Sequence, residues 1–250
     1  MSQFPQTLKT WRKSRRFSQL DLALEADVSA RHISFLESGR SRPSADMIAR
    51  LGDALQMPLS ARNQMLTHAG YSARYAARGW DDAAMQPIRD AVRHMLTAHA
   101  PYPAMAVDRL WTVVDLNEPA ERLFGLLQVG QGSSLLDLMM RPDLSDVIEN
   151  WEDVAHHSAL RLRTESAAQG GVPELDQVAA ILNAVPNPVH VPDSAVIPTV
   201  YRAGPLRLSL FGTIAQFGTP CDMTLDDLKI ELFFPADAET EQALRGLEGT

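Results

Sequence analysis

The spacing of apolar residues divides the chain into a helical first third and a longer part in which strands and helices alternate. Over the first 70 residues, apolar positions recur three and four residues apart, which is typical of amphipathic helices. Serines precede several of these runs, and glycine or proline follows them. We therefore predict a compact all-α domain of five short helices, over residues 8–16, 19–26, 30–38, 45–55 and 59–69.

The first of these helices is strongly cationic on one side. Leu8 and Trp11 are expected to face inward. The residues expected to face outward are Lys9, Arg12, Lys13, Arg15 and Arg16. This cationic face has two interpretations that the pattern leaves open, since it could be merely solvated or could lie near phosphate.

Residues 18–44 predict two helices joined by a tight turn. Ser18 and Ser29 can cap the helix N-termini, and Gly39 can end the second helix. The positions expected to face inward are Leu20, Ala23 and Leu24 in the first helix and Ile33 and Leu36 in the second, with Val28 filling the gap between them. We interpret this pair as a helix-turn-helix that enters the major groove of DNA.

The outer face of the second helix has residue types that suit base recognition. The expected base-reading residues are Ala30, Arg31, Ser34 and Phe35; Arg31 can donate two hydrogen bonds to a guanine, and Phe35 can pack on a thymine methyl. Phosphate contacts are expected from Gln19, His32, Arg40 and Arg42. The plain alternative is an ordinary two-helix corner, and an outward phenylalanine beside an arginine argues against it.

The same stretch resembles the lambda-repressor-like, or xenobiotic-response-element, helix-turn-helix family. That pattern has glutamine at the start of helix two and Glu-x-Gly at the end of helix three, which Gln19 and Glu37-Ser38-Gly39 match. The longer string from Arg31 to Ser44 looks like one subgroup, the MmyB-like bacterial regulators. The resemblance implies that double-stranded DNA is a partner.

From residue 81 onward the pattern changes to mixed helices and strands. A helix over 81–100 precedes two strand-like runs, at 104–107 and 110–114. The helices expected next are one capped by Asn117, one over 135–140, a longer one through 144–155 and one over 174–184. A proline-rich loop over 186–198 leads into strands over 196–202, 206–217 and 229–234 and a terminal helix over 237–247. Two strands, a block of helices and three strands is the order of a PAS-like domain, an antiparallel sheet with helices over one face that often encloses a small-molecule pocket.

Three strings in this second part look like signatures of the PAS-like ligand-binding module of MmyB-like regulators. They are Asn150-Trp151-Glu152, Phe217 to Pro220, and Ile230 to Asp237. The resemblance implies a pocket and, for some members, a fatty-acid-like ligand. The fold class we predict is multidomain: an all-α helix-turn-helix domain (1–75), a linker and connecting helix (76–100), an α+β PAS-like domain (101–236), and a C-terminal helix and tail (237–250).

Aromatic residues in the second part are candidates for lining an apolar pocket. They are Trp111, Phe124, Trp151, Phe211, Phe217 and Phe233. Such a pocket would suit an acyl chain or a flat aromatic metabolite. The alternative is that these side chains fill a packed core.

Charge is unevenly distributed along the chain. Residues 1–80 carry 12 lysines and arginines against 6 aspartates and glutamates, whereas the remaining residues carry 11 against 25. A basic head on an acidic body is expected of a DNA-reading domain joined to one with another role. The N-terminus lacks a signal-peptide pattern, no run is long enough to span a membrane, and the single cysteine, Cys221, fits a reducing compartment. We therefore expect a cytoplasmic protein that does not contact membranes.

Patterns typical of enzymes and metal sites are weak. The seven histidines include no His-Glu-x-x-His, and the adjacent His156 and His157 point in different directions on a helix. Gly130-Gln-Gly132 is too short for a dinucleotide loop, and no nucleophile motif is present. We expect no catalytic activity, no metal and no cofactor.

Two hypotheses follow. The first is a transcriptional regulator that binds a pseudo-palindromic operator as a homodimer and responds to a small apolar ligand, a fatty acid for example. The second is a DNA-bound scaffold whose second domain only dimerises or docks a protein partner. A bound small molecule would distinguish the two.

Overall fold

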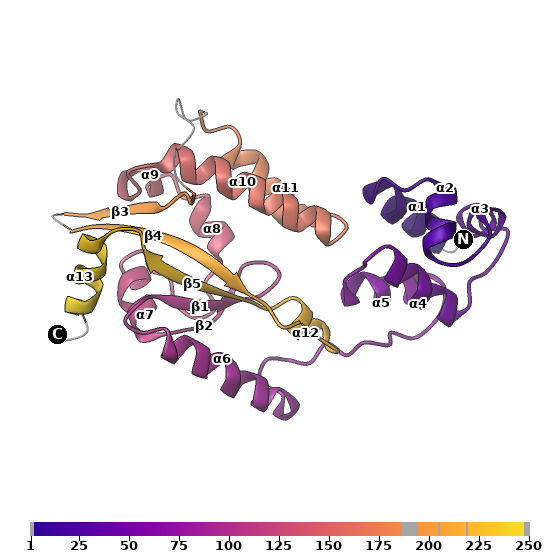
Figure 1. The fold of residues 1–250 in the computed structure, drawn as a ribbon, viewed down its shortest axis with the longest axis horizontal. Helices are drawn as coiled ribbons and strands as arrows, with labels where there is room; N and C mark the ends of the chain where they lie inside the picture. The colour runs from indigo at the N-terminus through magenta and orange to yellow at the C-terminus, as the bar shows by residue number, and fades with distance from the viewer. Residues whose placement is uncertain (1–2, 187–194, 205, 219, 248–250) are drawn as a thin grey trace. The chain divides into compact units, whose positions relative to one another are not determined.

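The computed structural model describes residues 3–186, 195–204, 206–218 and 220–247 (Figure 1). It forms two compact units: residues 1–77 with 164–172 and 219–226, and the remainder of the chain. Part of the predicted proline-rich loop (187–194), Pro205, Thr219 of the string at 217–220 and the end of the tail (248–250) lie outside the described residues.

The N-terminal residues of the first unit form the predicted all-α arrangement. Its helices are α1 (Phe4–Ser14), α2 (Gln19–Glu25), α3 (Ala30–Glu37), α4 (Ala45–Ala54) and α5 (Leu59–His68). Ser18, Ser29 and Ser44 each accept a backbone hydrogen bond as N-caps, and Ser18 forms a full capping box with Asp21. The predicted inward residues Ile33 and Leu36 are fully buried in the common core. The local caps therefore set where the helices begin, and one shared core holds them together.

The predicted inward face of α2 is confirmed for Ala23 and wrong for Leu20 and Leu24. Leu20 and Leu24 are 58% and 73% exposed, whereas Leu22, Ala23 and Ala26 are buried. Apolar residues occupy both sides of this short helix, and positions two apart point in nearly opposite directions. Periodicity alone could not decide which side would pack.

The second unit is built on an antiparallel sheet. Within the described residues the strand order is β2-β1-β5-β4-β3, and every neighbouring pair is antiparallel. The strands are β1 (Ala104–Val107), β2 (Val113–Leu116), β3 (Thr199–Ala203), β4 (Leu206–Ala215) and β5 (Lys229–Pro235). This arrangement confirms the predicted α+β class for the C-terminal part of the chain.

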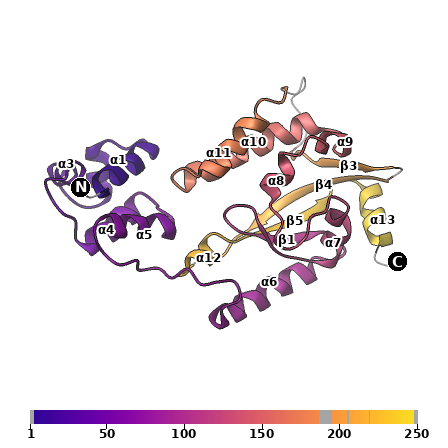
Figure 2. The ribbon, with the colours of Figure 1, turned by 180° about the vertical axis from the view of Figure 1, so that it is seen from behind.

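Helices lie on both sides of this sheet (Figures 1 and 2), so the expectation of helices over one face is wrong. They are the 3-10 turn η1 (Ala83–Met85), α6 (Gln86–Ala98), α7 (Glu118–Gly125), α8 (Leu135–Met139), α9 (Leu144–Val147), α10 (Trp151–Ala168), α11 (Pro173–Leu182) and α13 (Ala238–Gly246), and the short α12 (Met223–Asp226) belongs to the first unit. Figures 1 and 2 show α10 and α11 side by side over one face of the sheet and α6 on the opposite side. The face of the sheet toward α10 lines a cavity.

The single long helix predicted through residues 144–155 is broken into α9 and α10. Ile148 forms an antiparallel bridge to Tyr201, and the backbone N–H of Glu149 donates to the carbonyl of Val200 (2.9 Å). The Asn150 amide also donates to the carbonyl of Pro198 (2.7 Å). Pairing with the edge of β3 therefore replaces helical hydrogen bonds at this point, a tertiary effect that periodicity does not report.

Asn117 joins three elements of the second unit. As predicted, it caps α7, and its Oδ1 accepts from the backbone N–H groups of Ala104 (2.9 Å) and Ala120 (3.0 Å). Its Nδ2 donates to the carbonyls of Leu96 (3.0 Å) and Tyr102 (2.9 Å). One buried amide thus fastens α6, β1 and α7 together.

Asn117→Ala is expected to lower the free energy of unfolding of this unit by about 2 kcal/mol, because it removes a cap and leaves buried backbone groups without partners. Urea unfolding and hydrogen exchange of α7 measure the loss. The control is Ser134→Ala, which removes the N-cap of α8 without buried partners and should cost about 1 kcal/mol or less. Equal losses in the two variants would contradict the joining role of Asn117.

Candidate functional sites: an exposed helix face and an apolar cavity

The outer face of α3 carries the residues predicted to read bases. Because Ile33 and Leu36 are fully buried, the opposite side of the helix is turned outward. Arg31 is exposed, and Ser34 and Phe35 are half-buried. Ala30 lies at the first helical position, half-buried and packed against the core. The helix therefore presents Arg31, Ser34 and Phe35 on its outer face, with Ala30 at the edge of that face against the core.

Phe35 is flanked by two cations. The guanidinium carbons of Arg31 and Arg40 lie 5.1 Å and 6.0 Å from its ring centroid. Such cation–π contacts hold flexible arginines over an aromatic surface. The predicted phosphate-contacting residues Arg40 and Arg42 are exposed just beyond α3, and His32 is half-buried on it. A cationic surface surrounds the aromatic ring, as contact with an anionic polymer requires.

Gly39 sets the position of Arg40. It has a φ of +72°, a conformation that side chains disfavour, and it ends the helical path of α3. The backbone N–H groups of Arg40 and Ser41 then donate to the carbonyl of Phe35 (2.9 Å and 3.2 Å). The turn thereby brings Arg40 back beside Phe35.

A buried ion pair joins α1 to α3. Arg12 Nε donates to Glu37 Oε1 (2.6 Å) and Arg12 Nη2 to Glu37 Oε2 (3.0 Å). The two side chains are only 11% and 4% exposed. Arg12 also donates to the carbonyl of Phe17 (2.7 Å), so its predicted outward position is wrong. Arg12 faces inward because the buried Glu37 carboxylate needs a partner.

Gln19 is part of the same network. Its amide Nε2 donates to Glu37 Oε2 (2.8 Å) from the first position of α2. Burial raises the pKa of Glu37, but hydrogen bonds from Arg12 and Gln19 lower it by more, so this pKa lies below its ordinary value of 4.5. The charged network fixes α1, α2 and α3 relative to one another. In the sequence, the Glu37-Ser38-Gly39 string pointed to Glu37 as a residue of interest. It did not reveal that Glu37 pairs with Arg12.

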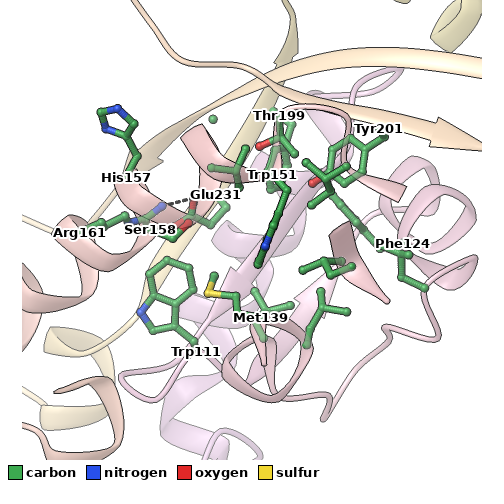
Figure 3. A pocket seen from close by; sticks show the side chains of 18 of the residues that line it. Trp111, Phe124, Met139, Trp151, His157, Ser158, Arg161, Thr199, Tyr201 and Glu231 are labelled. Atoms are coloured by element: carbon green, nitrogen blue, oxygen red, sulfur yellow. Dashed lines mark hydrogen bonds and ion pairs between the residues drawn. The ribbon is translucent and has the colours of Figure 1, made fainter. Parts of the chain in front are cut away.

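A cavity of about 280 Å³ lies in the second unit between the sheet and helices α7 to α10. Four predicted aromatic residues line it: Trp111, Phe124, Trp151 and Phe233. Figure 3 shows Trp151 projecting between Trp111 on one side and Phe124 with Tyr201 on the other. Most of the remaining lining is aliphatic, including Met105, Leu135, Leu138, Met139, Leu144 and Ile148. A cavity of this composition suits an apolar molecule.

One wall of the cavity is charged. Arg161 Nη2 donates to Glu231 Oε1, and Arg161 Nη1 donates to Glu231 Oε2 at 3.3 Å (Figure 3). The Arg161 guanidinium carbon lies 4.3 Å from the ring centroid of Trp111, which has a positive φ of 61°. Sequence reasoning missed this pair. Its signals were the helical spacing of Arg161 from Val154, seven residues earlier, and the strand alternation of Glu231 with Phe233.

Two family models match the chain. The model described as the MmyB-like transcription regulator ligand binding domain matches residues 88–247, and a helix-turn-helix model matches residues 8–61. The chain belongs to the MmyB-like transcription regulators. Comparison with curated protein sequences finds no match.

The MmyB-like regulator is thus a DNA-binding transcription regulator with a ligand-binding domain. Both matched families are transcription-regulator domains. Among the residues that the structure describes, no helix is long and apolar enough to cross a membrane. Within the same residues, no three His, Cys, Asp or Glu side chains gather as metal ligands would.

Two predicted cavity residues lie elsewhere in the MmyB-like regulator. Phe211 pairs with Phe234 across β4 and β5 and stacks on it (5.7 Å between centroids), whereas the neighbouring pair Gly212 and Phe233 lines the cavity. Adjacent strand residues point to opposite faces, so Phe211 is turned away. Phe217 follows the end of β4 at Ala215 and is not a lining residue. The assignment of Phe211 to the cavity is wrong because the sequence does not reveal which face of β4 is covered, and that of Phe217 is wrong because β4 ends before it.

A second polar group of the regulator's cavity is the Tyr201 hydroxyl. Burial raises the pKa of Tyr201 to about 12, and a hydrogen bond with Thr199 acts in the opposite direction with a smaller effect. Both residues line the cavity. Tyr201 therefore remains protonated at neutral pH, and it offers a neutral hydroxyl to a molecule in the cavity.

Proposed function

We propose that the chain is a sequence-specific regulator whose DNA binding responds to a small apolar ligand, with a fatty acid or a derivative of one as the model. The observation that carries this proposal is the cavity of about 280 Å³ with its aromatic and aliphatic lining. Pockets that bind small molecules are concave and largely apolar, with a few polar groups that orient the ligand. The cavity of the second unit has this composition.

On the DNA side, we propose that α3 enters the major groove. Ala30, Arg31, Ser34 and Phe35 would contact base edges, since they share the outward face of that helix. Phosphate contacts would come from Gln19, His32, Arg40 and Arg42. One helical domain contacts few base pairs, so a homodimer on a pseudo-palindrome, with half-sites about 34 Å apart, is the expected assembly.

The ligand would act by population shift. A ligand that binds one arrangement of the regulator more tightly than another shifts the equilibrium toward the first. We propose a DNA-binding domain at residues 1–75, a connecting segment at 76–100, a ligand-binding domain at 101–236 and a C-terminal segment at 237–250. We also propose that the regulator works in the cytoplasm. The size of the regulatory effect is bounded by the difference in ligand affinity between the two arrangements.

Mass spectrometry of small molecules released from denatured full-length protein tests the ligand proposal. We expect a stoichiometric apolar molecule from the natural protein and none from Gly212→Leu. Gly212 lines the cavity, and a Cβ there would meet Glu231 and Phe233 at ordinary contact distances of 3.7 Å and 3.8 Å, so the larger side chain is directed into the cavity space. Equal amounts of the same molecule from both proteins would place it outside the cavity. Recovery of nothing from either protein would favour the scaffold alternative.

A further inference from the structure

The C-terminal end of α10 packs in the first unit, although it lies in the part of the chain that the ligand-binding model matches. Residues 164–172 belong to the first unit, whereas residues 151–163 of the same helix belong to the second. Trp151 and Arg161 line the cavity. Ala168 follows Arg161 by two helical turns, about 10 Å along the axis. One continuous helix therefore leads from the cavity wall into the unit that contains the helix-turn-helix.

Trp11 of α1 and Arg15, which follows α1, hold this end of α10. Arg15 Nη2 donates to the carbonyl of Ala168 (3.1 Å), and Arg15 Nε donates to the carbonyl of Leu55 (3.0 Å). The Arg15 guanidinium carbon also lies 5.3 Å from the centroid of the Trp11 ring. A Cβ at Gly170 would lie only 2.2 Å from Trp11 Cζ2, closer than two carbon atoms can approach without a bond. The Trp11 ring therefore packs directly on the backbone of Gly170.

The turn that follows α10 has a fixed backbone. The N–H of Gly171 donates to the carbonyl of Ser166 (2.8 Å), and the N–H of Val172 donates to the Ser166 hydroxyl (2.8 Å). Gly170 and Gly171 have φ angles of +86° and +101°, which side chains disfavour. A Cβ at Gly171, unlike one at Gly170, would meet nothing within 4 Å. The two glycines thus share a conformation and differ in their contact with Trp11.

α1 connects this contact to α3. Trp11 is 3% exposed, and the next residue, Arg12, forms the buried ion pair with Glu37. Glu37 is the last residue of α3, the helix proposed to read bases. Because these side chains are closely packed and hydrogen-bonded, a change in the packing of Trp11 would displace or loosen α1 and, through Arg12, α3.

One feature of the packed turn is unfavourable. The side-chain oxygen of Gln169 is buried and has no hydrogen-bond partner among the residues that the structure describes. A buried acceptor without a partner destabilises the arrangement that contains it. Release of the turn from Trp11 would return this oxygen to solvent, which narrows the free-energy difference between a packed and a released turn. An element with two arrangements of similar energy is what couples one site to another.

We propose that the turn at residues 168–171 is the contact through which the ligand regulates DNA binding. A ligand in the cavity shifts the balance between a turn packed on Trp11 and a released turn, and the operator affinity of α3 follows. The inference rests on the proposed function, since it names the contact through which the same ligand would act. The released turn frees α1 from α10, while the cavity lining and the base-reading residues keep their side chains.

The test measures the operator Kd of full-length protein, freed of bound lipid, with and without saturating decanoate. Tryptophan fluorescence reports filling of the cavity, since Trp111 and Trp151 line it. Gly170→Ala places a methyl group against Trp11, so the turn cannot pack as it does in the natural protein. We expect decanoate to change the operator Kd by about 10-fold in the natural protein and by less than about 2-fold in Gly170→Ala, which should still bind decanoate.

Gly171→Ala is the matched control. It makes the same replacement at the neighbouring glycine, where φ is also positive and a Cβ has open space. Both variants carry the backbone strain, so thermal unfolding should show similar losses of stability from that source. Gly171→Ala should keep the change of about 10-fold in operator Kd, because its Cβ does not meet Trp11.

Hydrogen exchange in the natural protein tests the inference without any substitution, and it decides the matter if Gly170→Ala does not fold. Decanoate should change the exchange rates of backbone amides at residues 11–15 and 166–172 by about 5-fold or more, since the turn and α1 would be packed together or released together. Exchange that changes around the cavity and stays the same in both of these segments overturns the inference.

The outcomes separate the inference from the proposed function. A natural protein that responds to decanoate while Gly170→Ala responds equally overturns the inference and leaves ligand regulation standing. Loss of the response in Gly171→Ala as well as in Gly170→Ala also overturns it, because backbone strain and not the Trp11 contact would be the cause. A natural protein that does not bind decanoate, or binds it with no change in operator Kd, overturns the proposed function, and the inference fails with it. Loss of the response in Gly170→Ala alone supports both.

Discussion

Glu37→Ala is expected to lower the free energy of unfolding of the helix-turn-helix by about 3–5 kcal/mol, because it leaves a buried arginine without its partner. Arg12 and Glu37 are 11% and 4% exposed and share two hydrogen bonds, and Gln19 adds a third. Hydrogen exchange of α1 and α3 in the full-length protein, with urea unfolding, measures the loss. Asp53→Ala is the control, since Asp53 pairs with Arg62 in the same domain but is 71% exposed. That change should cost less than about 1 kcal/mol.

The same network predicts an acid dependence. The pKa of Glu37 is lower in the folded protein than its ordinary value of 4.5. A carboxyl group with a depressed folded pKa stabilises the fold above the unfolded pKa, and this contribution is lost as the pH falls through the folded pKa. The natural protein should therefore lose stability more steeply below pH 4.5 than Glu37→Gln, which has no carboxyl to titrate. Parallel acid profiles, or a Glu37→Ala loss no larger than that of Asp53→Ala, would contradict the role given to the pair.

Arg31→Ala is expected to weaken binding to the preferred operator by about 1–3 kcal/mol and to remove the preference at one base pair. Arg31 is exposed on the outward face of α3 and is held over the Phe35 ring, so it is pre-positioned to donate two hydrogen bonds to a guanine. Fluorescence anisotropy with operators substituted one base pair at a time measures the change. A loss shared equally by all sequences would assign Arg31 to phosphate contact instead.

Two substitutions serve as comparisons for Arg31→Ala. Arg40→Ala should weaken binding to all sequences alike and reduce the slope of log affinity against log salt by about 1, as loss of one phosphate contact does. Arg93→Ala removes an exposed arginine that pairs with Asp115 in the second unit and should leave DNA affinity unchanged. An unaltered salt slope in Arg40→Ala would remove Arg40 from the phosphate-contacting set.

The parts of the fold that local chemistry decides could be predicted from the sequence. Ser18, Ser29 and Asn117 cap helices as expected, because a short polar side chain before an apolar run is a local signal. Ile33 and Leu36 are buried as their spacing predicts. The order of strands and helices correctly predicted an antiparallel sheet with helices.

The parts that depend on contacts distant in sequence could not be predicted. In the sequence, Arg12 resembles the exposed lysines and arginines near it. Its partner Glu37 lies 25 residues further along the chain, and only the fold brings the two together. Phe211 and Phe233 are both strand aromatics, and only the pairing of β4 with β5 shows that they face opposite sides. The Arg161–Glu231 wall likewise joins residues 70 positions apart. Each miss comes from a tertiary partner that no local pattern contains.

The measurement that tests the central claim most directly is operator affinity with the cavity filled and empty. An operator selected from randomised duplexes is titrated with full-length protein freed of lipid, with and without decanoate at a concentration that saturates the tryptophan fluorescence change. The account predicts a shift of about 10-fold or more in the operator Kd for the natural protein, within the usual range of allosteric coupling, and no shift for Gly212→Leu. An operator Kd that stays the same while fluorescence shows a filled cavity would contradict regulation by the ligand.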